Sequence, residues 1–122
     1  MRIIAVVFLG LWLTACAVFQ NPVNTTRLAA VESAYGVALS IAVAYRNTRL
    51  CKRGEAPTVT NVCAKRDVIE QLQAADRKVQ IALIAARQFV RDNPTLDAFA
   101  VIQAAQQAVD IFRAIQIENG VQ

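Results

Sequence analysis

The three cysteines are the residues of this chain best suited to chemistry, and no histidine accompanies them. Cysteine and serine nucleophiles are usually activated by a neighbouring histidine, so the composition argues against Cys–His and Ser–His catalysis. Two cysteines without histidine also make a poor zinc site, and the spacing of Cys51 and Cys63 differs from the Cys-x-x-Cys of redox enzymes. We expect no catalytic residues, no bound metal and no cofactor.

Residues 1–15 have the order of a secretory signal sequence. Arg2 supplies the positive start, and an apolar stretch runs from Ile3 to Leu13. This stretch is about eleven residues long, well short of the ~20 that cross a bilayer as a helix. We therefore expect residues 1–15 to be a signal peptide that is removed on export.

Leu13, Thr14, Ala15 and Cys16 follow the apolar stretch directly. This tetrad resembles the lipobox of bacterial lipoprotein precursors, in which an aliphatic residue and two small residues precede a cysteine. The resemblance implies cleavage before Cys16, a diacylglycerol thioether on its sulfur, and acylation of the new amino terminus, for example with palmitate. Two or three acyl chains anchor a protein stably, whereas one binds only marginally. The alternatives are an ordinary signal peptide with a chance cysteine, and a retained membrane anchor.

Position 17 is alanine, whereas lipoproteins kept in the inner membrane tend to carry aspartate after the lipidated cysteine. The resemblance therefore implies a lipid-anchored protein of the bacterial envelope, with the outer membrane facing the periplasm favoured.

Cys51 and Cys63 remain as an even pair once Cys16 carries lipid. The segment between them contains glycine, proline and polar residues, which is typical of a connection between helices. An exported chain reaches an oxidising compartment, where such a pair forms a disulfide. We predict a Cys51–Cys63 disulfide, and closing a loop of this length stabilises a fold by roughly 3 kcal/mol in the chain-entropy model.

A cluster of basic residues lies around this cysteine pair. The cluster comprises Arg46, Arg49, Lys52, Arg53, Lys65 and Arg66. One interpretation is a surface for an anionic partner such as peptidoglycan, lipid head groups or an acidic protein. The other is a charged, solvated loop without a partner, and the sequence leaves both open. The net charge of +4 is too small to indicate nucleic acid.

Helices must position these residues, because the chain is rich in alanine and has only four glycines and three prolines. We predict an all-α fold: a three-helix bundle over residues 25–122, after the cleaved signal peptide and a short tether of residues 16–24. Apolar spacing and capping residues predict helices over about 26–49, 64–91 and 94–117. The first helix has one apolar face, made of Leu28, Val31, Tyr35, Ala38, Ala42 and Tyr45.

The second predicted helix carries a heptad seam. The seam comprises Val68, Leu72, Ala75, Val79, Ala82, Ala86 and Phe89. Antiparallel packing within the chain and a coiled coil with a partner both have this period. The third predicted helix has more apolar surface than two neighbours use, so Val101, Ile111 and Ile115 are candidates for self-association or a partner contact.

The leader, the cysteines and the helical pattern together predict a membrane-anchored envelope lipoprotein with a structural or interaction role, not an enzyme. Its partners would be the membrane, through lipid on Cys16, and an envelope protein, peptidoglycan or a second copy. The chain is also weakly similar to small prophage-type lipoproteins and to the outer-membrane spanin subunits of phage lysis. Spanin subunits tend to be proline-rich and extended, unlike this chain. A small lipoprotein that blocks a receptor or inhibits an envelope enzyme is the other alternative.

Overall fold

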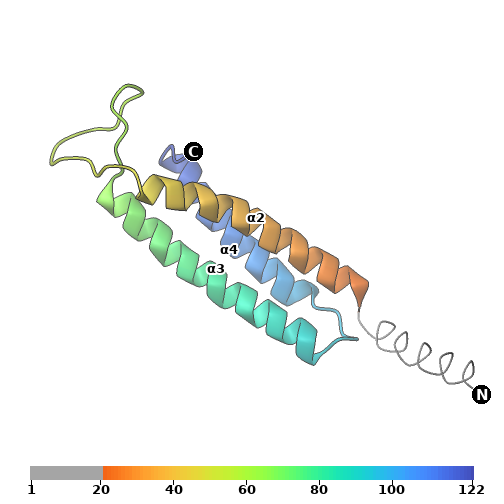
Figure 1. Cartoon of the computed structure of the whole chain (residues 1–122). Coiled ribbons are helices and arrows are strands. Elements are labelled where there is room, and N and C mark those ends of the chain that lie inside the picture. The colour runs from red at the N-terminus through yellow and green to blue at the C-terminus, as the bar shows by residue number, and fades with distance from the viewer. Residues whose placement is uncertain (1–20) are drawn as a thin grey trace, which may run out of the picture.

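A computed structural model describes residues 21–122 of the chain, and this part is a bundle of three helices without strands. The helices are α2 (Pro22–Arg46), α3 (Arg66–Asp92) and α4 (Phe99–Glu118). They lie side by side along one axis, with the long connection and the C-terminus at one end (Figure 1). The predicted all-α three-helix bundle is confirmed. The predictions for residues 1–15 and for Cys16 lie outside the described residues.

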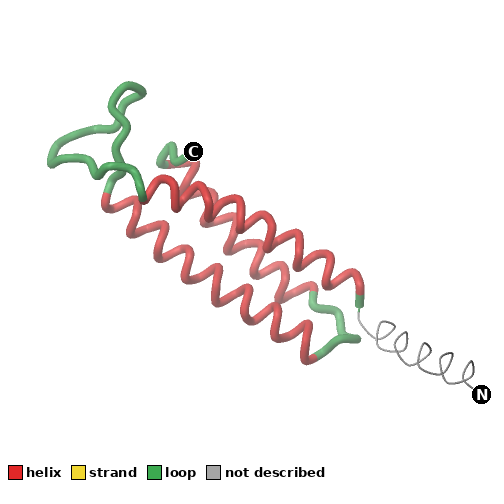
Figure 2. The backbone as a smooth tube through the Cα atoms, in the orientation of Figure 1, coloured by secondary structure: helices red, strands yellow, loops and turns green. Residues whose placement is uncertain are grey.

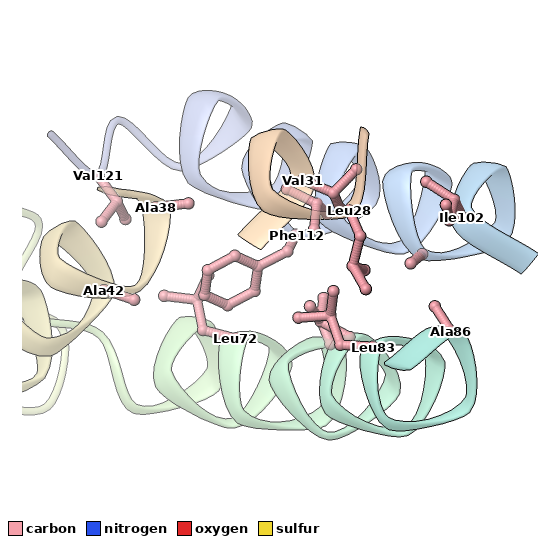
Figure 3. Close-up of a cluster of buried hydrophobic side chains, with 14 of the residues drawn as sticks. Leu28, Val31, Ala38, Ala42, Leu72, Leu83, Ala86, Ile102, Phe112 and Val121 are labelled. Atoms are coloured by element: carbon pink, nitrogen blue, oxygen red, sulfur yellow. The ribbon is translucent and has the colours of Figure 1, made fainter. Parts of the chain in front are cut away.

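The core runs along the bundle axis between all three helices (Figure 3). The heptad seam predicted for α3 packs into this core. The buried residues of α3 are Val68, Leu72, Ala75, Val79, Leu83 and Ala86. Two seam positions, Ala82 and Phe89, are only half-buried, and Leu83 was not predicted. The reason is that a straight helix has 3.6 residues per turn, so a strict seven-residue repeat drifts by about 20° per heptad.

The apolar face of α2 was also predicted correctly. Leu28, Val31, Ala38 and Ala42 are buried, and the two tyrosines are half-buried at its edges. The ring of Tyr35 meets that of Phe112 edge-on, with 6.2 Å between the ring centroids.

The start of α2 differs from the prediction. The helix begins at Pro22 and not near residue 26, because Asn21 caps it: the Asn21 Oδ1 accepts a hydrogen bond from the Val23 N–H at 3.1 Å. Proline suits the first helical position, where its missing N–H would have no partner. The predicted tether of 16–24 is therefore wrong for residues 22–24, which are helical.

The end of α2 and the start of α3 also differ from the prediction. The structure ends α2 at Arg46 and not at 49, and it begins α3 at Arg66 and not at 64. The backbone beyond each helix is used elsewhere, since the Ala64 N–H donates to the Arg49 carbonyl at 2.8 Å. Residues in such a bridge cannot also adopt helical geometry.

The start of α4 is the largest difference. It lies at Phe99 and not at residue 94, because the side chain of Asn24 fixes the preceding backbone in a turn. The Asn24 Nδ2 donates to the Leu96 carbonyl at 2.7 Å, and the Asn24 Oδ1 accepts from the Ala98 N–H at 3.2 Å. The Asp97 carboxylate then accepts from the Phe99 N–H at 2.9 Å.

The surplus apolar surface predicted for the third helix lies partly at other positions than expected, since Phe99 is 51% exposed and Ile117 75% exposed. Val101 and Ile115 pack half-buried against the core, so the prediction is wrong for these two residues. Ile111 is 58% exposed, as predicted. A buried polar residue that the sequence did not indicate, Gln116, donates from Nε2 to the Ala38 carbonyl of α2 at 2.6 Å.

By length and composition, α2 is apolar enough to cross a membrane, with a mean hydropathy of 1.5 over its most apolar window. Core helices of soluble proteins pass the same test, so this is weak evidence. It is compatible with membrane association of the N-terminal part of the chain.

Replacing Asn24 by alanine should lower the free energy of unfolding by about 1–3 kcal/mol, because two backbone groups would lose their buried partner. Chemical denaturation followed by circular dichroism measures the difference. Thr25→Ala is the matched control, since the Thr25 side chain is exposed and bonds only to the Pro22 carbonyl. If Asn24→Ala proved as stable as Thr25→Ala, the role given to Asn24 would be wrong.

Candidate functional site

The connection between α2 and α3, residues 47–65, is the longer of the two connections in the bundle (Figure 2). Cys51 and Cys63 are joined in a disulfide with their Cα atoms 4.9 Å apart, as the sequence predicted. Next to it, the Cys51 N–H donates to the Ala64 carbonyl at 2.9 Å. Cys63 and Ala64 are fully buried. The neck of the loop is therefore fixed to the bundle, and we call residues 47–65 the stapled loop.

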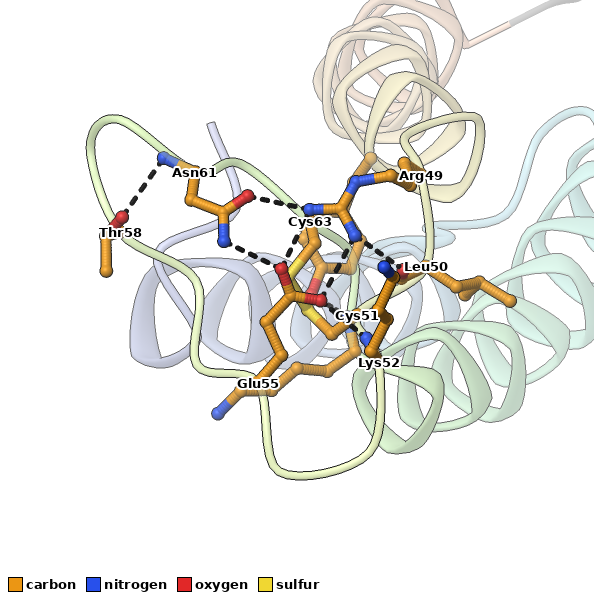
Figure 4. Close-up of a disulfide and its surroundings, with 10 residues drawn as sticks. Arg49, Leu50, Cys51, Lys52, Glu55, Thr58, Asn61 and Cys63 are labelled. Atoms are coloured by element: carbon orange, nitrogen blue, oxygen red, sulfur yellow. Dashed lines mark hydrogen bonds and ion pairs between the residues drawn. A yellow bond between two sulfur atoms is a disulfide. The ribbon is translucent and has the colours of Figure 1, made fainter.

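The interior of the stapled loop is ordered by one network of polar side chains (Figure 4). Both carboxylate oxygens of Glu55 accept from the guanidinium of Arg49, at 2.9 and 3.1 Å. The Asn61 amide bridges these two residues, with its Oδ1 2.7 Å from Arg49 Nη2 and its Nδ2 2.7 Å from Glu55 Oε1. A bidentate pair fixes the relative orientation of its partners as well as their distance.

The same network governs the ionisation of Glu55. Hydrogen bonds from the Arg49 side chain, the Lys52 N–H and the Asn61 side chain lower the pKa of Glu55 to about 2. In turn, Glu55 raises the pKa of the Arg49 guanidinium. The carboxylate therefore keeps its charge, and the loop its internal pairing, well below the pH at which an ordinary glutamate is protonated.

A tight turn brings Lys52 and Glu55 together inside the loop. The Glu55 N–H donates to the Lys52 carbonyl at 2.9 Å, while Gly54 has a φ of 79°. A positive φ at the third position of a turn strongly favours glycine, because other side chains are strained there. The turn aims the Lys52 N–H at the Glu55 carboxylate, 2.6 Å away.

The predicted basic cluster lies at this end of the bundle, with one correction. Arg49 is paired with Glu55, so its charge is used inside the loop and it is not available to a partner. The other five cluster residues are exposed, and the described part of the chain gives them no ion pair. They are Arg46, Lys52, Arg53, Lys65 and Arg66. We call these five the basic end.

Apolar side chains of the stapled loop lie near these charges. Val59 is 98% exposed and Val62 is 64% exposed. Together with Pro57 they line a hollow that the C-terminal residues Glu118 and Gln122 also line. The loop therefore offers a contact surface of mixed character: a held backbone, exposed apolar residues and an excess of positive charge.

The remaining polar contacts between helices serve to hold the bundle together. The Tyr35 hydroxyl donates to the Asp76 carboxylate and so links α2 to α3. Burial and this hydrogen bond raise the pKa of Tyr35, which disfavours the phenolate that nucleophilic or base chemistry would need. Within residues 21–122, no three His, Cys, Asp or Glu side chains gather closely enough to hold a metal ion.

Sequence reasoning found the cysteines and the basic residues but missed Asn61 and the pairing of Arg49. No local pattern marks Asn61, because a polar residue in a loop gives no sign of which side chains, here Arg49 and Glu55, the path of the loop will bring to it. Comparison of the chain with models of protein families, with curated proteins and with solved structures finds no match. The stapled loop and its basic end are therefore the candidate functional site on geometric grounds alone.

Proposed function

We propose that this protein is a lipid-anchored interaction protein of the bacterial envelope. The observation that carries the proposal is the tetrad that ends in Cys16, placed directly after an apolar leader. The Cys51–Cys63 disulfide supports export, because disulfides persist in oxidising compartments. Ala17 favours the outer membrane, with the folded body in the periplasm.

The arrangement of the bundle supports a membrane anchor at one end and a binding surface at the other. The start of α2, a few residues after Cys16 in the sequence, lies at one end, and the stapled loop lies at the other (Figure 1). A helix of 27 residues such as α3 is about 40 Å long. The bundle would then hold the basic end at about that height above the bilayer, where an anionic envelope component could be bound.

Replacing Cys16 by serine should abolish lipidation, because serine offers no thiol for the thioether. In a bacterial host the wild-type protein should incorporate labelled palmitate and partition into detergent, and Cys16→Ser should do neither. Cys63→Ser is the control, since it breaks the disulfide and leaves Cys16 intact. A wild-type protein recovered without lipid, with an amino terminus at Ala17 or later, would contradict the anchoring.

The basic end should be needed for binding to an anionic polymer such as peptidoglycan. Lys52→Glu combined with Arg53→Glu should lower co-sedimentation with isolated peptidoglycan several-fold, and added salt should weaken wild-type binding. Arg77→Glu combined with Lys78→Glu is the matched control: an adjacent, exposed basic pair in the middle of α3. Equal losses in both double variants, or no wild-type binding above background, would reject this partner.

A further inference from the structure

The end of the bundle that holds Asn21 presents three exposed large apolar side chains. Val23 is 49% exposed, Leu96 54% and Phe99 51%. They come from the first turn of α2, the connection between α3 and α4, and the first residue of α4. We call these three residues the apolar end face. Single exposed apolar residues are ordinary on protein surfaces, whereas several together indicate a contact.

Contacts between the three segments hold the apolar end face together. Asn24, one residue after Val23, bonds to the Leu96 carbonyl at 2.7 Å. The Arg27 guanidinium lies 5.5 Å from the centroid of the Phe99 ring. The Asn21 N–H donates to the Pro94 carbonyl at 2.9 Å. The three apolar side chains are therefore held near one another by the fold.

The charges around this face are balanced. Arg91 pairs with Asp92 at 3.3 Å, and the Asp97 carboxylate accepts from the Phe99 N–H. Arg27 and Asp97 then offset each other, so the face offers a partner little net charge. Apolar side chains edged by an arginine suit a phospholipid surface, because the side chains can enter the acyl region while the guanidinium reaches the phosphates.

The chain outside the described residues indicates what covers this face. Five residue steps separate Cys16 from Asn21, and at about 3.6 Å a step they span at most about 18 Å. A lipid on Cys16 would thus keep the end of the bundle that starts at Asn21 within that distance of the bilayer. Tethering makes even a weak contact effective, because the bilayer is always near.

We propose that the apolar end face rests on the phospholipid bilayer and inserts Leu96 and Phe99 into its interface. This inference rests on the proposed lipid anchor and adds a second, non-covalent contact to it. The anchor fixes only one point of the chain, whereas the end face fixes the tilt of the bundle and so the direction in which the stapled loop points.

A single-tryptophan experiment tests the contact. Trp12 is the one tryptophan of the chain and lies in the leader, so the processed protein has none. Phe99→Trp and, separately, Leu96→Trp place a reporter on the end face, and Val59→Trp places one on the stapled loop. Each processed, lipidated protein is reconstituted into phosphatidylethanolamine–phosphatidylglycerol vesicles in which part of the lipid carries brominated acyl chains.

Tryptophan at 99 or 96 should be quenched by about half or more, since interfacial residues lie about 5–10 Å into the boundary region. Tryptophan at 59 should stay unquenched, and salt should change neither result. If all variants float with the vesicles but positions 99 and 96 behave like 59, the end-face contact is wrong and the anchor stands. If the tryptophans at 99 and 96 are shielded from water without being quenched by lipid, and this shielding rises with protein density, the face contacts a second copy of the chain. If no variant floats, the anchor and the contact both fail.

Discussion

The two hydrogen bonds of the Asn24 side chain are the interaction on which the rest of the bundle depends. Much of the core is alanine, and small side chains interlock too little to fix how far one helix slides along another. Asn24 joins the first turn of α2 to the backbone just before α4. Gln116 forms a similar link further along the bundle, where its side chain on α4 donates a hydrogen bond to the Ala38 carbonyl of α2. Both side chains are buried, so a shift of one helix along another would leave a buried polar group without a hydrogen-bond partner, at a cost of about 1–3 kcal/mol.

Order at the opposite end has a different origin. There the chain leaves the helices for the stapled loop, and the disulfide, the backbone bridge at Ala64 and the Arg49–Glu55 pair replace helical hydrogen bonds. Glu55 is held in its charged form, so the pairing does not compete with protonation near neutral pH. A loop ordered in this way can present Lys52 and Arg53 without losing much conformational entropy when a partner binds.

The sequence predicted those features that repeat or that act locally. The face of α3 from Val68 to Ala86 was predicted from its spacing, and the pairing of Cys51 with Cys63 was predicted from the expected export and an even count. The start of α4 was the least predictable helix end, because Asn24 fixes the backbone before it from more than seventy positions away. The pairing of Arg49 with Glu55, six positions away, was missed for another reason: a charged residue near other charges gives no sign of which partner the fold will bring to it.

In the proposed orientation the bundle stands on the bilayer, with the apolar end face down and the basic end up. Neutron reflectometry of the lipidated protein on a supported bilayer measures this directly. An upright bundle predicts a protein layer about 40 Å thick, the length of α3. A layer of about 20 Å, two helix diameters, would show the bundle lying on its side and contradict the claim.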